Sequence, residues 1–95
     1  MTKDWTKDIE YILKKFDFTR VQKAMVALDW KWSGMGHSGF PSLEDLKETA
    51  RVLLTRAISF KSSDSIATGG FEVTKWDDHL NLSFHVEEVN SLYMK

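Results

Sequence analysis

The chain has 95 residues, of which 13 are basic and 14 are acidic, so its formal net charge is −1. This balance excludes the strongly basic surface of a non-specific nucleic-acid binder, and the absence of cysteine excludes a disulfide framework, a thiolate nucleophile and a cysteine-based zinc site. No apolar run approaches the ~18 residues that span a bilayer, so we expect a single domain, residues 1–95, that is located in the cytoplasm and does not bind membranes.

Two helices are predicted in the first third of the chain. Residues 4–16 carry one apolar stripe at helical spacing. The stripe consists of Trp5, Ile9, Ile12, Leu13 and Phe16. Asp17 and Thr19 predict a break followed by a new start, because short polar residues favour helix N-termini. A second helix with its own apolar face is expected over residues 19–29.

Residues 29–32, which alternate charged and aromatic side chains, end the second helix. Their alternation predicts a short extended segment that pairs with the edge of a hairpin near the C-terminus. Residues 33–41 are then predicted to form a loop, because three glycines, two serines and a proline in nine positions disfavour regular structure.

The third helix is predicted over residues 42–58. Ser42 precedes an apolar stripe, and the acidic Asp45 follows three residues later, as in a capping box with Asp in place of Glu or Gln. The stripe consists of Leu43, Leu46, Ala50, Leu53, Leu54 and Ala57. A serine-rich connection at residues 61–65 follows this helix and is expected to be mobile.

A β-hairpin is predicted within residues 68–88. Phe71 and Val73 share one face of its outgoing strand. The returning strand alternates apolar and polar side chains, which is typical of a half-buried strand. Its apolar residues are Leu80, Leu82, Phe84 and Val86. Asp77 and Asp78 are the expected turn residues.

These elements predict an α+β domain in which two or three helices pack on a small antiparallel sheet built on the C-terminal hairpin. A two-stranded hairpin is marginal alone in water, so its apolar face requires the helices as a cover. The sheet is thin, and exposed sheet edges pair with other chains. We therefore expect a homodimer that extends the sheet.

The glycine-rich segment at residues 34–39 matches the pattern G-x-G-x-x-G. In dinucleotide-binding folds this pattern joins a strand to a helix, and its glycines let the backbone approach a pyrophosphate. Here no buried strand precedes the pattern, and Phe40 and Pro41 separate it from the third helix, so a dinucleotide fold is disfavoured. Two interpretations remain: the amides of Gly34 and Gly36 bind an anion, or the segment is a flexible connector.

The sequence contains three histidines and no evident catalytic pair. His79 and His85 share the polar face of one strand about 20 Å apart, so they cannot hold one metal ion and are interpreted as solvent-facing. His37 lies in the glycine loop, where a histidine is able to reach a ligand, and it is the acid–base candidate if the chain is an enzyme. Because His37 has no obvious partner, we expect no enzymatic activity, no metal and no cofactor.

Four tryptophans are a high count for this length. Trp5 belongs to the apolar stripe of the first helix. The hairpin pattern places Trp76 opposite the core face. Trp30 and Trp32 flank Lys31, and aromatic rings beside a cation and glycine amides are able to stack a base and hold its phosphate. The same rings equally suit a protein-binding patch, or they close the edge of a small core.

Gly69 and Gly70 precede the outgoing strand of the hairpin. Paired glycines at the start of a strand indicate a bulge, or a close approach of the backbone to a helix, a second chain or a ligand. The candidate binding residues are therefore Trp30, Lys31, Trp32, Gly34, Gly36, His37, Gly69, Gly70 and Trp76.

Several motifs resemble those of short, mostly uncharacterised proteins of tailed bacteriophages and prophages. These motifs are LDWKW at residues 28–32, PSLEDLKETARVLL at residues 41–54, and TGGF followed by LNLSF in the hairpin. They span most of the chain and include no catalytic signature. By analogy, the resemblance implies a small accessory protein that acts by binding.

Two functions from different classes follow from these observations. The first is a non-enzymatic phage binding protein, active in counter-defence or host modulation, that sequesters a nucleotide-like signal or blocks a host or defence protein. The nucleotide mode would use Trp30, Lys31, Trp32, His37 and the glycine amides, whereas the protein mode would use Trp30, Trp32 and Trp76. The second function is a small structural or assembly protein of the virion that self-associates through a sheet edge.

Overall fold

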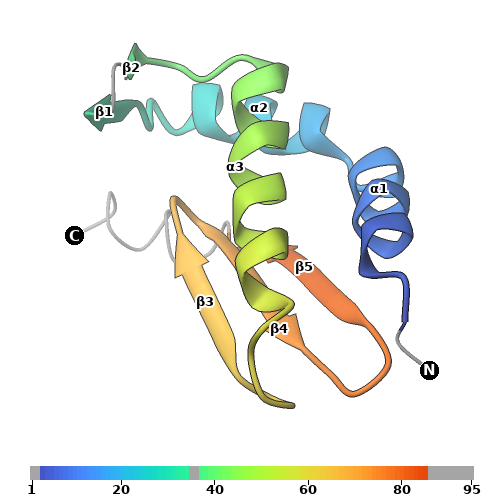
Figure 1. Ribbon diagram of the computed structural model, residues 1–95. Coiled ribbons are helices and arrows are strands. Elements are labelled where there is room, and N and C mark those ends of the chain that lie inside the picture. The colour runs from blue at the N-terminus through green and yellow to red at the C-terminus, as the bar shows by residue number, and fades with distance from the viewer. Residues whose placement is uncertain (1–2, 35–36, 86–95) are drawn as a thin grey trace.

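The computed structural model describes residues 3–34 and 37–85, and it confirms the predicted α+β fold (Figure 1). In these residues three helices accompany a three-stranded antiparallel sheet, and a short two-stranded hairpin extends to one side. The helices are α1 (Trp5–Lys15), α2 (Phe18–Ala27) and α3 (Leu43–Ala57). The strands are β1 (Trp32–Gly34), β2 (His37–Gly39), β3 (Ser65–Thr68), β4 (Phe71–Lys75) and β5 (Leu80–Phe84).

Aspartate side chains begin the first two helices, as expected for short polar residues at helix N-termini. Asp4 Oδ1 accepts a hydrogen bond from the backbone N–H of Lys7 at 3.4 Å. Asp17 Oδ1 accepts one from the N–H of Arg20 at 3.0 Å. The predicted break at Asp17 is confirmed, and because Asp17 itself is the cap, α2 already begins at Phe18.

The capping box of α3 is confirmed. Ser42 Oγ accepts a hydrogen bond from the N–H of Asp45 at 3.1 Å, and Asp45 Oδ2 accepts one from the N–H of Ser42 at 3.0 Å. Aspartate therefore replaces the usual glutamate or glutamine without loss of either bond. The two bonds satisfy backbone donors that the helix leaves free at its first turn.

The predicted C-terminal hairpin is present as β4 and β5. Phe71 pairs with Phe84 and Val73 pairs with Leu82, so the apolar residues of both strands share one face. The turn between the strands includes both predicted aspartates. Val86, the last apolar residue of the predicted strand, lies outside the described residues.

A further strand, β3, follows the serine-rich connection after α3, and the sequence pattern does not predict it; of the predicted connection, only Ser65 belongs to the strand. Ile66 of β3 pairs with Val73 of β4, and a bulge precedes this pairing. The N–H of Ser63 donates to Lys75 O at 2.7 Å, while the N–H of Lys75 donates to Asp64 O at 2.9 Å, so two residues oppose one. Ser63 has a positive φ of 71°. Ladder hydrogen bonds with β4 and the packing of Ile66 on the core stabilise β3.

Residues 33–41 also differ from the irregular loop that their composition predicts. Trp32 pairs with Gly39 and Gly34 pairs with His37, so β1 and β2 form an antiparallel hairpin. Of the alternating run at residues 29–32, only Trp32 belongs to a strand, and it pairs with the glycine segment and not with the C-terminal hairpin. Gly39, the last residue of β2, has a φ of 106°, a conformation that glycine adopts without strain. Glycine here permits a hairpin as well as a loop.

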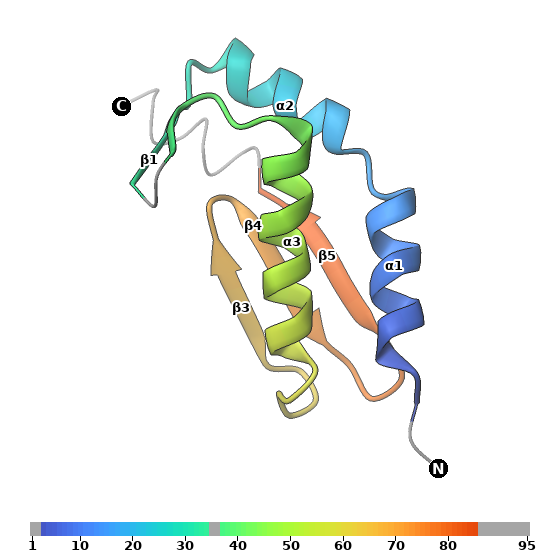
Figure 2. The same cartoon turned by 45° about the horizontal axis from the view of Figure 1, so that its top comes forward.

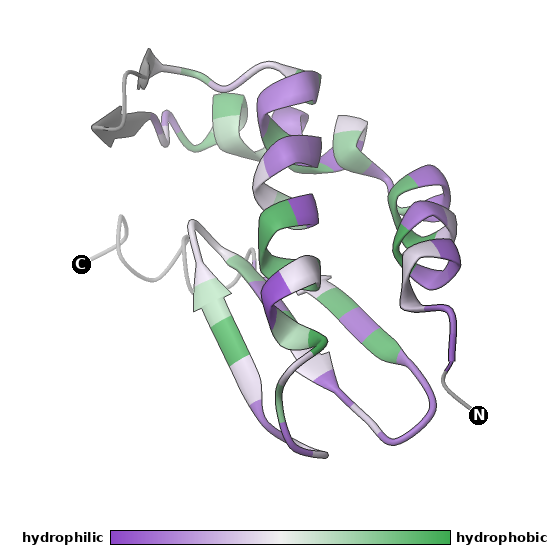
Figure 3. Ribbon diagram, in the orientation of Figure 1, coloured by the Kyte–Doolittle hydropathy of each residue, from purple (hydrophilic) through white to green (hydrophobic). Residues whose placement is uncertain are grey.

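One core joins the three helices to the sheet. α3 lies across one face of the sheet, α1 lies beside α3 next to β5, and α2 crosses the end of α3 (Figures 1 and 2). Hydrophobic and hydrophilic residues alternate along β5, as a strand with one buried face requires (Figure 3). The buried residues are Ile9, Leu13, Phe18, Val21, Met25, Leu46, Ala50, Leu53, Leu54, Ala57, Phe71, Val73 and Leu80. Each large side chain among them contributes about 1.5–3 kcal/mol by burial.

Candidate functional site

Trp30 is positioned by the C-terminus of α2. The N–H of Asp29 donates to Val26 O at 3.1 Å, and the N–H of Trp30 donates to Met25 O at 2.8 Å. These two bonds form a Schellman motif, with Asp29 in the left-handed conformation at a φ of 53°. The motif ends the helix and turns the chain, so the indole of Trp30 packs on the edge of the core and is half-buried.

Gly70 lies against the ring of Trp30. The ring centroids of Trp30 and Phe84 are 5.8 Å apart, and both rings contact Gly70. A methyl group on Gly70 would lie 2.5 Å from Phe84 Cε2 and 2.8 Å from Trp30 Cη2. Gly69 and Gly70 form the turn between β3 and β4, with φ values of 62° and 91°. The close approach predicted from the paired glycines is therefore present, and its partners are two aromatic rings of the same chain.

Lys31 is exposed and has two neighbours. Its Nζ lies 3.7 Å from Asp29 Oδ1 and 5.6 Å from the ring centroid of Phe40. An exposed ion pair of this kind contributes little to stability. The cation required by the nucleotide mode thus lies beside Phe40, whereas the ring of Trp30 lies against Phe84.

Trp32, Gly34 and His37 belong to the β1–β2 hairpin, where Gly34 and His37 are directly opposite each other. The backbone of these three residues is described, but the side chains of residues 32–38 lie outside the described part of the structure. Gly36 lies outside it altogether. The stacking and anion-binding roles expected for these four residues stay predictions.

Trp76 lies at the turn between β4 and β5, which we call the hairpin tip (residues 76–79). The N–H of Trp76 donates to His79 O at 2.9 Å, and the two rings stack with centroids 6.4 Å apart. Trp76 is 42% exposed, and His79 is exposed as predicted. His79 Nδ1 lies 2.7 Å from Asp78 Oδ1, and this hydrogen bond, together with the charge of the imidazolium, lowers the pKa of the Asp78 carboxyl below its ordinary value.

Two lysines connect the hairpin tip to the N-terminal part of the chain. Lys3 Nζ donates a hydrogen bond to the backbone oxygen of Asp78 and lies 5.3 Å from the ring centroid of Trp5. Lys75 Nζ lies 5.2 Å from the same ring and donates to Ile58 O at 2.5 Å. The indole of Trp5 therefore contacts two ammonium groups, which is a favourable cation–π arrangement. The hairpin tip is held by contacts from outside the hairpin as well as by its own turn.

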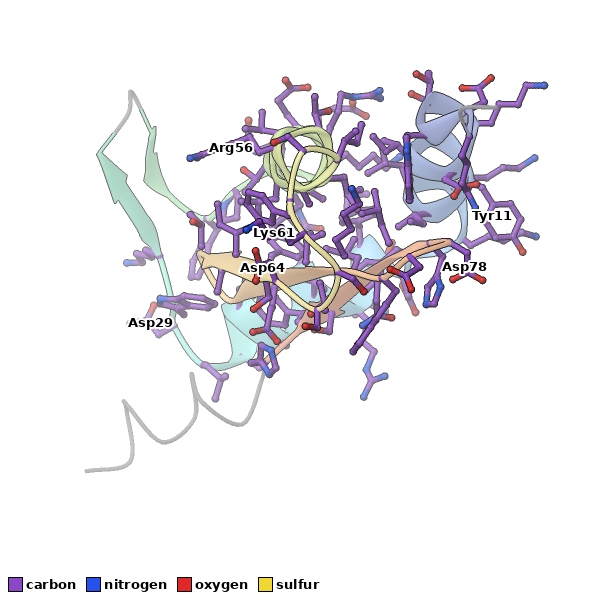
Figure 4. The ribbon with its side chains drawn as sticks, turned by 60° about the horizontal axis from the view of Figure 1, so that its bottom comes forward. Tyr11, Asp29, Arg56, Lys61, Asp64 and Asp78 are labelled. Atoms are coloured by element: carbon purple, nitrogen blue, oxygen red, sulfur yellow. The ribbon has the colours of Figure 1, made fainter. Side chains whose placement is uncertain are left out.

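The predicted site residues that contact the three-stranded sheet or belong to it fall into two separate groups. Trp30, Gly69 and Gly70 meet at the turn between β3 and β4. Trp76 lies at the other end of β4, about 20 Å away along six residues of extended chain. Figure 4 shows the same separation, because Asp29 and Asp78 lie on opposite sides of the molecule. Trp30 and Trp76 therefore belong to different surfaces of one chain.

A groove that the sequence pattern does not reveal lies between β5 and the junction of α1 with α2. Its volume is about 320 Å³. The lining residues are Phe16, Asp17, Arg20, Val21, Leu82, Ser83 and Phe84. They come from opposite ends of the chain and meet only through the packing of the helices against the sheet. No local motif marks such a groove.

His85 has a partner that the strand pattern also does not reveal. Its Nε2 lies 2.9 Å from Glu72 Oε1, and Ser83 Oγ donates to the backbone oxygen of Glu72 at 3.5 Å. Glu72 pairs directly with Ser83, so His85 meets it on the diagonal of the ladder. This histidine is half-buried and hydrogen-bonded, in contrast to the solvent-facing residue that was expected. The contact is predictable only once the register of the two strands is known.

Residues 3–34 and 37–85 contain no group of three or more His, Asp and Glu side chains that is arranged to hold a metal ion. In the same residues, no helix combines the length and the apolar composition that crossing a membrane requires.

The hairpin tip carries three groups that are able to recognise a partner: an exposed indole, an imidazole whose Nδ1 contacts a carboxylate, and that carboxylate itself.

Comparison of the chain with protein-family models, with curated proteins and with solved structures finds no match. The resemblance to phage proteins rests on the motifs at residues 28–32, 41–54 and in the hairpin, and it stays a prediction.

Proposed function

We propose that this chain is a non-enzymatic, phage-encoded binding protein that blocks a host or defence protein in the host cytoplasm. The observation that carries the proposal is the hairpin tip, where Trp76 is 42% exposed and stacks on His79. Tryptophan is enriched among the residues that dominate the energy of protein–protein interfaces. Its large ring buries much apolar area, and its N–H donates a hydrogen bond.

The order of the hairpin tip supports a binding role. The chain itself supplies the backbone bond from Trp76 to His79, the contact of His79 with Asp78 and the bond from Lys3 to Asp78. An interface costs about 0.5–1.5 kcal/mol for each flexible side chain that it immobilises. Side chains that are already ordered reduce this cost, so the tip is suited to act as an anchor.

Two observations favour the protein mode over the nucleotide mode. Trp30, the ring that a nucleotide site would use for base stacking, is half-buried and packs against Phe84 and Gly70. At the hairpin tip, Asp77 and Asp78 are exposed, and their carboxylates repel the phosphates of a nucleotide. A protein surface with apolar and basic groups is the partner that the tip suits best.

The test compares Trp76→Ala with Tyr11→Ala, which removes a different exposed ring from α1. The unchanged chain and both variants would be immobilised, exposed to lysate from bacteria with active phage-defence systems, and analysed by quantitative mass spectrometry. We expect at least one host protein that binds the unchanged chain and Tyr11→Ala, but whose capture falls about tenfold or more with Trp76→Ala. Because Trp76 is exposed, the melting temperature should change little.

Equal capture by the two variants would contradict the assignment of the hairpin tip. Capture of no protein by any of the three chains would contradict the protein mode.

Native mass spectrometry of the chain taken directly from lysate tests the nucleotide mode. A discrete added mass of nucleotide size that is lost on denaturation would replace our proposal.

A structural or assembly protein of the virion is the second candidate, and the outer strands of the sheet favour it. Within the described ranges, no strand lies beside the outer edge of β3 or of β5, and open edges pair with further chains. Size-exclusion chromatography with light scattering distinguishes the candidates. A ladder of oligomers that grows with concentration indicates assembly, whereas we expect a fixed homodimer for the binding protein.

A further inference from the structure

β5 has unpaired backbone groups along its outer edge. The N–H of His85 donates to Gly70 O at 2.9 Å, which identifies His85 as a hydrogen-bonded position of the ladder between β4 and β5. Hydrogen-bonded and non-hydrogen-bonded positions alternate along an antiparallel pair. The N–H and C=O groups of Leu82 and Phe84 therefore point away from β4. Because β5 is the last strand of the sheet in the described part of the chain, these groups face no further strand there.

The same half of β5 forms one wall of the groove at the junction of α1 with α2. Leu82 and Phe84 line this wall, and Phe16 and Val21 line the wall across from it. The groove has a volume of about 320 Å³, and the two residues that carry the free backbone groups, Leu82 and Phe84, are part of its lining. It can receive an apolar side chain from a strand that pairs with β5.

Arg20 places a positive charge in the lining of this groove. The residue is exposed, and its backbone N–H is bound by Asp17. Its guanidinium forms no ion pair with an acidic residue in the described ranges 3–34 and 37–85. Asp17 also lines the groove, and its carboxylate accepts the hydrogen bond from the N–H of Arg20. The guanidinium of Arg20 is left for a partner, and an unpaired guanidinium favours a partner that carries a carboxylate.

We propose that an extended segment of the partner protein adds to the sheet as a strand beside residues 82–84. It would place an apolar side chain in the groove and an acidic side chain beside Arg20. Main-chain hydrogen bonds supply affinity in this mode of recognition, and the groove supplies preference for the partner's sequence. The proposal rests on the proposed function and deepens it, since it names the part of the partner that is recognised. A homodimer would then form at β3, the other edge of the sheet.

The probe for the test is a short peptide that alternates valine and threonine and carries an aspartate at each end. It would be titrated into the full chain and followed by amide NMR. We expect the amides of Leu82 and Phe84 to shift and to exchange more slowly with solvent, because they gain hydrogen bonds. The amides of Asn81 and Ser83 face β4 in the ladder and should change little. If the chemical shifts and exchange rates of the Leu82 and Phe84 amides stay unchanged up to the highest soluble concentration of peptide, the proposal is overturned.

Arg20→Glu tests the charge, with Lys23→Glu as a matched control. Arg20 is the third residue of α2, where a glutamate stabilises the helix start, so the variant is expected to fold. Lys23 lies one turn later, is exposed and does not line the groove. We expect Arg20→Glu to weaken binding of the aspartate peptide about tenfold or more, and Lys23→Glu to have little effect.

A peptide with lysine in place of aspartate should bind Arg20→Glu better than it binds the unchanged chain. Equal losses in the two variants would overturn the role of Arg20. Protection of the Leu82 and Phe84 amides without peptide, at concentrations where sedimentation shows a dimer, would assign the edge to a second copy of the chain and overturn the proposal. Capture of a host protein through Trp76 without peptide binding at β5 would leave the proposed function standing and refute strand addition alone.

Discussion

Gly70 joins two constraints at a single residue. Its φ of 91° lies in a region that residues with a side chain rarely adopt, and the rings of Trp30 and Phe84 occupy the space where a side chain would be. The turn between β3 and β4, the end of α2 and the end of β5 meet at this point. The close backbone approach that the paired glycines predict is therefore a packing contact within the chain.

Gly70→Ala is expected to lower the free energy of unfolding by about 2–4 kcal/mol, because the methyl group meets two rings and the backbone is strained. Gly39→Ala is the matched control. Gly39 also has a positive φ, but a methyl group there would meet no atom within 4 Å. From strain alone we expect a loss of about 1–2 kcal/mol. Urea unfolding of both variants measures the difference, and equal losses would show that the rings move aside without cost.

At the scale of the elements, the ends of the helices depend on single residues. Asp29 ends α2 in the left-handed conformation, a position that glycine usually occupies. The negative end of the helix dipole also disfavours a carboxylate there. The Schellman bonds form nevertheless, and the packing of Trp30 on the core offsets the unfavourable residue.

Asp29→Gly is therefore expected to raise the free energy of unfolding by about 0.5–1 kcal/mol, since glycine adopts a positive φ without strain. Asp29→Asn is the control: it removes the charge and the contact with Lys31 but keeps a residue that tolerates the left-handed conformation. Chemical unfolding of the three proteins separates the backbone effect from the charge effect. A glycine variant less stable than the unchanged chain would contradict this account of the helix end.

Across the whole molecule, the packing is uneven. α3 contacts α1, α2 and all three strands of the sheet, and five of its residues are buried. β1 and β2 pair with each other and extend to one side, without extensive contact to another described element (Figure 1). Regions with few buried contacts open at a lower free energy than the core.

We expect the amides of β1 and β2 to exchange through local opening, at a free energy well below that of global unfolding. The amides of Leu53, Leu54 and Val73, which are buried in α3 and β4, should reach the global value. Native-state hydrogen exchange at increasing denaturant concentration measures both. Protection of β1 and β2 up to the global limit would show that a contact outside the described residues covers this hairpin.

The sequence by itself determined the three helices, the C-terminal hairpin and the α+β class. Asp17 and the pair Ser42 and Asp45 act on backbone groups within three residues, and the burial of Phe71 and Val73 follows from alternation along one strand. Such signals are local, so they are readable without the fold.

Only the tertiary structure decided where the remaining parts lie. It paired residues 65–68 with β4 as the strand β3, folded the glycine segment into a hairpin, and placed Trp30 on Gly70 at the far end of the sheet from Trp76. It also built the groove beside Arg20. The groove and the contact of Trp30 with Gly70 join residues that are distant in the chain, whereas the pairing of β1 with β2 and of β3 with β4 depends on strand register. Burial on the shared core and strand register outweigh the local preferences on which sequence reading relies.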